Sequence, residues 1–302
     1  MTSGVDMAKD MDRVLGFVVP DRHARGRVVR MGPTLKAVLS SHDYPPVIER
    51  LVAESLLLAA VLGSLLKGDS GQLTMQAQTN GGPVSLLVCD YLDGAVRGHA
   101  QFDADRVALL SESPTLTDLF GTGYLAITFD QSLTKERYQG IVPLDGNGLS
   151  DAVQRYFLQS EQIPSFIRVG FSTDGSVGGA LMVQHLPEGE DGRERLHVRL
   201  DHPEWDHVRI LAQTIKDSEL CDPELPLETI VWRLFNEEQE VRVLGGASLT
   251  KGCRCNAERI KSVVGQFPAD ERIEMAGESG VISVDCAFCS KIFPMPLTEF
   301  VD

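Results

Sequence analysis

The first 186 residues alternate between apolar runs and short polar or glycine-containing breaks. Residues 46–66 are rich in leucine and alanine and are followed by Lys67-Gly68, a cation and a glycine of the kind that end helices, so a long buried helix is expected there. Strand-like runs follow at 72–79, 84–91 and 95–102. A Leu92-Asp93-Gly94 turn joins the last two runs, which predicts an antiparallel meander.

The same alternation continues after the meander. Residues 149–159 place apolar side chains at helical spacing, with Ser150 and Asp151 near the expected cap. Further strand candidates, each bounded by glycine, proline or aspartate, lie at 124–129, 138–144, 165–171 and 178–186. The order of helix, strands, helix and strands predicts an α+β fold: a large mixed domain with an antiparallel sheet, ending near Leu186.

A polar, glycine-punctuated stretch at 187–195 predicts an exposed connection and a domain boundary. Two helices are expected after it, at 205–218 and 225–238, separated by Cys221-Asp222-Pro223. The chain is therefore predicted to comprise an α+β core domain, a helical linker and a small cysteine-rich C-terminal domain, at 1–186, 187–244 and 245–302.

The charge balance and the longest apolar run exclude some classes of partner. The chain has 43 acidic and 28 basic residues, a net charge of −15, which would repel a nucleic acid. The longest uncharged apolar run, 56–66, is shorter than the roughly 20 residues that cross a bilayer. Charged residues from Asp6 to Arg13 interrupt any secretory signal, so a cytoplasmic protein is expected.

Four of the six cysteines lie close together near the C-terminus, as Cys253-Arg254-Cys255 and Cys286-Ala287-Phe288-Cys289. In a large chain without an export signal, such pairs favour metal binding over a disulfide framework. Each pair can present two sulfurs about 2.3 Å from one zinc ion, and the long insertion lets the pairs converge. All seven histidines lie at or before His207, so the predicted zinc ligands are the four cysteines.

Other readings of these cysteines remain open from spacing alone. The zinc could only staple a subdomain too poor in apolar residues to fold alone. Iron is a minor competitor for a four-sulfur site. A thioredoxin-like motif is disfavoured because Cys286-Ala287-Phe288-Cys289 follows a strand-like run instead of opening a helix.

Motifs outside this region point to no chemistry. Cys89 lies in an apolar strand and Cys221 beside a proline, positions where isolated cysteines are usually inert. The chain has no glycine-rich phosphate loop ending in Gly-Lys-Ser or Gly-Lys-Thr, so an ATP-driven mechanism is not expected.

Longer motifs accompany the two cysteine pairs. They are Tyr-Gln-Gly-Ile-Val at 138–142, Tyr-Phe-Leu-Gln-Ser-Glu-Gln-Ile-Pro at 156–164, Gly-Gly-Ala-Leu-Met-Val-Gln-His-Leu-Pro at 178–187 and Trp-Arg-Leu-Phe-Asn-Glu-Glu at 232–238. With these motifs, nearly the whole chain resembles the 33-kDa heat-shock protein family of redox-regulated holdase chaperones. The four cysteine positions show no departure from the family pattern.

The resemblance implies a zinc-bound, inactive, reduced monomer and no enzymatic activity. Cys253, Cys255, Cys286 and Cys289 would hold zinc, and oxidation would join Cys253 to Cys255 and Cys286 to Cys289. Zinc would then leave, and the oxidised form, often a homodimer, would hold unfolded or misfolded client proteins without ATP under oxidative stress.

Two functions from other classes compete with the holdase. The same cysteines could serve a thiol-disulfide oxidoreductase, or a zinc ribbon that recruits a partner, although the charge argues against nucleic acid. For the holdase, residues 205–240 are the segment expected to unfold on zinc loss and thereby to expose Trp232. That segment is charged, with few apolar residues expected beyond Ile210, Leu211, Leu234 and Phe235.

Overall fold

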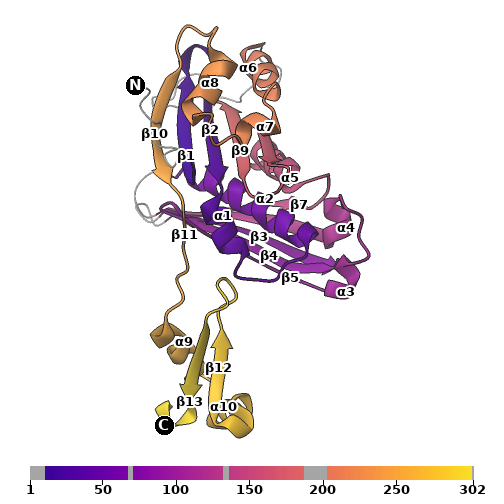
Figure 1. Ribbon diagram of the computed structural model, residues 1–302, viewed down its shortest axis with the longest axis vertical. Coiled ribbons are helices and arrows are strands. Elements are labelled where there is room, and N and C mark those ends of the chain that lie inside the picture. The colour runs from indigo at the N-terminus through magenta and orange to yellow at the C-terminus, as the bar shows by residue number, and fades with distance from the viewer. Residues whose placement is uncertain (1–10, 67–70, 132–135, 187–202, 301–302) are drawn as a thin grey trace.

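The computed structural model describes residues 11–66, 71–131, 136–186 and 203–300. Within these ranges, two largely antiparallel sheets with helices between and beside them are followed by a small C-terminal unit (Figure 1). The predicted α+β class with an antiparallel sheet is confirmed.

The six-stranded sheet, called sheet B here, has the strand order β11-β5-β4-β3-β6-β7. Its strands are β3 (Gln72–Gly81), β4 (Val84–Leu92), β5 (Ala95–Phe102), β6 (Gly121–Gln131), β7 (Glu136–Pro143) and β11 (Thr250–Lys251). Asp93 and Gly94, with φ of 47° and 79°, form the two-residue turn between β4 and β5. The predicted meander is confirmed, and only β11 adds to this sheet in parallel.

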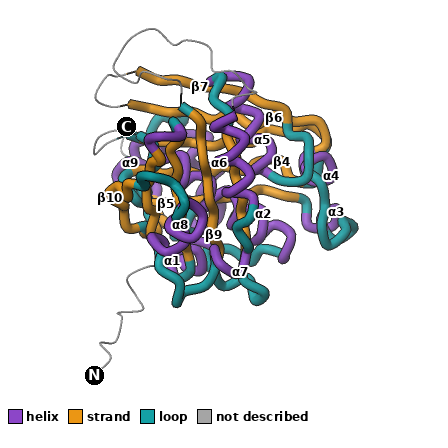
Figure 2. Tube along the Cα trace, turned by 90° about the horizontal axis from the view of Figure 1, so that it is seen from above, coloured by secondary structure: helices purple, strands orange, loops and turns teal. Residues whose placement is uncertain are grey.

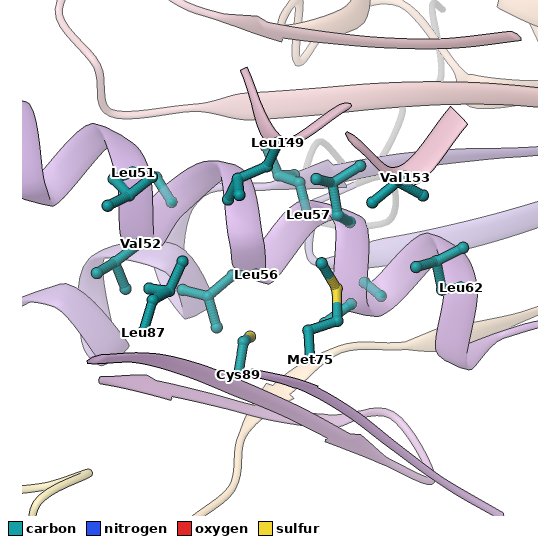
Figure 3. Close-up of a cluster of buried hydrophobic side chains, with 14 of the residues drawn as sticks. Leu51, Val52, Leu56, Leu57, Leu62, Met75, Leu87, Cys89, Leu149 and Val153 are labelled. Atoms are coloured by element: carbon teal, nitrogen blue, oxygen red, sulfur yellow. The ribbon is translucent and has the colours of Figure 1, made fainter. Parts of the chain in front are cut away.

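Helix α2 (Pro46–Gly63) forms the centre of the main core, as the leucine- and alanine-rich run predicts. It is buried on every side from Ser55 to Gly63, the pattern of a helix enclosed in a core. Figure 3 shows Leu56 and Leu57 of α2 near Met75 and Cys89 of sheet B. Shorter helices accompany it: α1 (Pro33–Leu39), α3 (Ala104–Val107), α4 (Leu116–Phe120) and α5 (Leu149–Tyr156), the last continued by a π-helical turn (Phe157–Glu161).

The five-stranded sheet, called sheet A here, has the strand order β10-β1-β2-β9-β8, with all neighbours antiparallel. Its strands are β1 (Arg13–Val19), β2 (Ala24–Met31), β8 (Ser165–Phe171), β9 (Gly178–His185) and β10 (Arg242–Ser248). All eight residues of β9 are buried because both faces of the sheet are covered. Ala180 and Met182 pack into the α2 core, whereas Leu181 and Val183 pack into a second core on the other face.

Three helices of the predicted linker form that second core: α6 (Pro203–Gln213), α7 (Asp217–Leu220) and α8 (Leu227–Phe235). Figures 1 and 2 both place α6 and α8 against sheet A. The rings of Phe17 on β1 and Phe235 on α8 lie 5.5 Å apart across this interface. The predicted helices are therefore present, while the connection expected at 187–195 lies outside the described residues.

Two expectations about this segment are wrong. It is not poor in buried apolar residues, since nine apolar side chains beyond the four expected lie in the second core: Trp205, Val208, Ala212, Ile215, Leu220, Leu225, Leu227, Ile230 and Val231. The expected exposure of Trp232 on opening of the segment is also wrong, because 64% of its surface is already exposed in the folded segment. Helix α8 turns Leu227, Ile230 and Leu234 toward the sheet, so Trp232 lies on the opposite face.

Two glycines allow α7 to approach sheet A closely. A Cβ atom at Gly179 of β9 would lie 2.6 Å from the carbonyl oxygen of Leu220. One at Gly170 of β8 would lie 2.9 Å from the Cβ of Asp217. Because backbone lies in the way at Gly179, any larger residue must push α7 outward.

We expect Gly179→Ala to lower the free energy of unfolding by about 1–3 kcal/mol, the usual cost of overpacking a buried site. Gly245→Ala on β10 is the control, because no described heavy atom lies within 4 Å of the added methyl group. Thermal unfolding followed by circular dichroism measures both. Equal melting temperatures for the two variants would show that α7 does not depend on this close approach.

The C-terminal unit contains α9 (Ala257–Val264), α10 (Ala269–Ala276), β12 (Val281–Asp285) and β13 (Ile292–Pro296), with β12 and β13 paired as a hairpin. Its hydrophobic cluster of buried residues has four members: Val264, Ala276, Ile282 and Met295. Strands β10 and β11, which precede it, pair with β1 and β5 of the two sheets. The division at 186 and 244 stays a prediction.

Candidate metal centre

The two cysteine pairs converge at one end of the C-terminal unit. Cys253 and Cys255 lie between β11 and α9, while Cys286 and Cys289 lie in the turn between β12 and β13. The four Sγ atoms all lie within 4.8 Å of one another. Two of the separations, Cys253 to Cys286 and Cys255 to Cys289, are 3.5 and 3.6 Å. A sulfur tetrahedron with metal bonds of about 2.3 Å has edges of about 3.8 Å, so the arrangement is of the size a metal requires.

Backbone hydrogen bonds shape the second cysteine loop, the turn between β12 and β13 that carries Cys286 and Cys289. The amide of Cys286 donates to the carbonyl of Lys291 at 3.0 Å, which closes the hairpin. The amides of Cys289 and Ser290 then donate back to the carbonyl of Cys286 at 3.2 and 2.8 Å. Ser290 has a left-handed φ of 55°, which lets the chain turn sharply after the second cysteine. The turn thereby keeps the two sulfurs of this pair within 4.8 Å of each other.

The protonation of the thiols shows why a cation suits this cluster. Burial raises the pKa of Cys253, but hydrogen bonds from the Cys255 amide and the other thiols outweigh it and lower that pKa to about 7. Burial, followed by the neighbouring sulfurs, raises the pKa of Cys255 to about 12. Burial also raises the pKa of Cys286. One thiolate forms readily, and a divalent cation supplies the positive charge that further thiolates need.

The other two cysteines lie elsewhere. Cys89 points from β4 toward α2 within the main core (Figure 3), and burial raises the pKa of its thiol far above the ordinary value. Cys221 follows α7 in the second core, where burial raises the pKa of its thiol to about 11. Both thiols are therefore protonated at neutral pH, the form that reacts poorly with oxidants.

Sequence analysis did not single out several residues that surround the cysteines. Arg254, within the first pair, reaches Asp90 on β4, and Phe288, within the second, lies against Arg97 on β5. The place of Arg254 and Phe288 between the paired cysteines was visible in the sequence. Their partners, more than 160 residues away, carried no such signal.

A family model described as Hsp33 protein matches residues 12–295. The chain belongs to the Hsp33 family. The resemblance found in the sequence motifs is thereby confirmed.

Two relatives named 33 kDa chaperonin illustrate the similarity to Hsp33 proteins. The one from Caulobacter vibrioides is 38% identical over 294 residues, with 94% of each chain covered. The one from Yersinia pestis is 32% identical over 280 residues, covering 92% of this chain and 90% of the relative.

A solved structure also has this Hsp33 fold. It is the crystal structure of the 33 kDa chaperonin, a heat shock protein 33 homolog, from Thermotoga maritima. The superposition has a TM-score of 0.75 with 20% sequence identity and covers 96% of both chains. No helix among the described residues of the present Hsp33 chain is long and apolar enough to span a bilayer.

Proposed function

We propose that this Hsp33-family chain is an ATP-independent holdase chaperone, inactive when reduced and zinc-bound, that binds unfolding proteins once its cysteines are oxidised. Its partners are unfolded or misfolded client proteins and, in the oxidised state, a second copy of the chain. The protein acts in the cytoplasm during oxidative stress, without enzymatic turnover and without nucleic acid or membrane. The convergence of four sulfurs from two distant loops carries the proposal.

Cys253, Cys255, Cys286 and Cys289 are the proposed zinc ligands. Zinc, when bound, would keep the four thiols deprotonated at neutral pH, the form that attacks peroxide. For each pair, two thiolates, one hydrogen peroxide and two protons give one disulfide and two waters. Two peroxides therefore oxidise the whole site, and the sulfurs can no longer serve as four thiolate ligands.

The proposed disulfides join near neighbours, Cys253 with Cys255 and Cys286 with Cys289. The separations of 3.5 and 3.6 Å between the pairs show that sulfurs of different loops are also close while the unit is folded. Metal loss changes this balance, because the small C-terminal core cannot hold the loops together alone. Residues two or three apart then stay within reach, whereas partners 33 or 34 residues apart must pay a larger loop-closure entropy.

The surface that takes the client is proposed to be the face of sheet A under α6–α8. This face is strongly apolar, with Leu15, Phe17, Val28, Leu181 and Val183 each at most 1% exposed while the helices cover it. Release of the helices would create an apolar patch suited to unfolded chains or to a second oxidised copy. The oxidised state therefore needs no ATP to present a binding surface.

One sample measured before and after peroxide treatment tests the proposed switch. The reduced protein should contain one zinc per chain and leave the aggregation of an unfolding client unchanged. After oxidation, zinc should pass to a chromophoric chelator and light scattering should fall at stoichiometric protein. Hydrogen exchange should quicken across 205–240 while 72–171 stays protected. Zinc release without suppression of aggregation, or catalytic turnover of an added disulfide, would contradict the holdase.

A further inference from the structure

The loops that carry the cysteines lie directly against sheet B. Arg254 stands between the two cysteines of the first pair and leaves its loop toward β3 and β4. Its Nη1 donates to Oε1 of Gln72 at 2.6 Å, and its Nη2 donates to Oδ2 of Asp90 at 2.8 Å. Only 5% of the Asp90 side chain is exposed, so this ion pair is shielded from water on the carboxylate side.

Phe288, within the second pair, reaches the same place from the other loop. The guanidinium carbon of Arg97 lies 3.9 Å from the centre of its ring, a cation–π contact. The ring of His99 lies edge-on at 6.5 Å. The second loop therefore meets β5 where the first meets β4.

Asp90 and Arg97 join these two contacts into one network. They face each other across β4 and β5, and Nε of Arg97 donates to Asp90 at 2.7 Å. Thr74 on β3 donates to the second carboxylate oxygen at 2.8 Å. One side chain from each cysteine loop thus meets the two members of a single, fixed ion pair.

From this juxtaposition we infer that Arg254 and Phe288 are positioning residues for the metal centre. By docking on Asp90 and Arg97 they hold the two cysteine loops at the separation that four sulfurs around one ion require. Metal binding and docking on sheet B then strengthen each other by the same factor, as linkage requires. The inference rests on the proposed metal centre and adds to it the residues through which the core domain senses the metal.

Docking and simple electrostatics predict opposite signs for one substitution. When four thiols bind a divalent ion and release their protons, the net charge of the site falls from near zero to near −2. Removing the nearby negative charge of Asp90 should therefore tighten metal binding if charge alone matters. If docking matters, Asp90→Asn removes the charged acceptor of Arg254 and should weaken metal binding. The direction of the change therefore distinguishes the two explanations.

The experiment measures the zinc affinity of the full-length reduced protein by competition with a chromophoric chelator under anaerobic conditions. Arg254→Ala and Asp90→Asn should each weaken affinity about tenfold, the size expected for a charge-assisted hydrogen bond. Arg259→Ala is the matched control, because it removes the same charge from an exposed position on α9 close to the site. It should change affinity by less than about twofold.

Phe288→Leu provides a second test that alters no charge and keeps an apolar side chain, should Asp90→Asn fail to fold. It should also weaken zinc binding while β4 and β5 stay protected from hydrogen exchange, because the core behind sheet B does not include the docked loops. A wild-type affinity in both Arg254→Ala and Phe288→Leu, or tighter binding in Asp90→Asn, would overturn the inference and leave the metal centre intact. A wild-type protein that binds no zinc would overturn the proposed function itself.

Discussion

Replacing Cys289 with serine is expected to remove the metal and unfold the C-terminal unit from Cys253 to Phe300. The buried hydrophobic cluster of this unit has only four members. Ordering each residue costs roughly 1–2 kcal/mol of backbone entropy, which so small a core cannot offset. A structural zinc site contributes on the order of 10 kcal/mol, and a serine hydroxyl does not replace a thiolate ligand. The loss of one ligand should therefore unfold the C-terminal unit.

Metal content, together with hydrogen exchange resolved along the chain, measures this effect. The Cys289→Ser protein should hold well under one zinc per chain, with rapid exchange in α9, α10 and the β12–β13 hairpin. Sheet B and α2 should stay protected because their core draws on a separate and much larger cluster.

Cys221→Ala is the matched control for the loss of a thiol. Cys221 lies in the second core and leaves all four clustered sulfurs in place. This variant should keep one zinc per chain and a protected hairpin. The prediction would be wrong if Cys289→Ser kept a protected hairpin without metal, because the fold of the unit would then not depend on the ion.

Most helices and strands between residues 13 and 186 were predictable from local pattern, because each is marked by the composition or periodicity of a short stretch. Helix α2 is a leucine- and alanine-rich run that begins with proline, and β3, β4 and β5 alternate or are bounded by turn residues. What local pattern could not supply is pairing across long separations. Val14 of β1 pairs with Ala247 of β10, and no feature of either strand's sequence predicts that the two strands are neighbours.

The convergence of the four cysteines was predictable for a different reason. Two pairs at metal-ligand spacing identify their own partners, because few other residues can satisfy four coordination positions. The docking partners of the cysteine loops were not predictable. Asp90 and Arg97 have no distinguishing feature in the sequence, and only the fold brings Arg254 and Phe288 to them. The predicted linker was anticipated only in part. Its helices were predictable from the sequence, but its many charged residues led to too low an expectation of the apolar surface that it buries.

Replacing Arg30 with alanine is expected to release the linker from sheet A while the metal stays bound. Arg30 is fully buried on β2, and its guanidinium group donates to three carbonyls of the linker, at 2.8, 2.8 and 3.1 Å. These carbonyls belong to Leu220, Leu225 and Glu219. Without the arginine they lose a charged donor and a cavity opens beside them, a cost of about 3 kcal/mol or more.

That cost falls on α7 and on the loop that leads from α7 to α8. The main core on the other face of sheet A keeps its own contacts, so the linker should open before the sheet does. Arg30→Lys should have an intermediate effect, because an ammonium group cannot reproduce the planar fork that spans three carbonyls. Arg25→Ala, on the same strand, is the control, since Arg25 donates to Gln184 of β9 at 3.0 Å.

The measurements are hydrogen exchange, zinc content and suppression of client aggregation, all on reduced protein. Arg30→Ala should exchange faster across 203–235 than across 72–102, retain one zinc per chain and suppress aggregation without oxidant. Uniformly faster exchange would show that Arg30 stabilises the whole core domain instead of the linker. An open linker with no suppression would place the client surface elsewhere. Activity with zinc still bound would separate two events that the proposed switch joins, the loss of zinc and the opening of the linker. The metal would then control the chaperone only by holding the linker against sheet A.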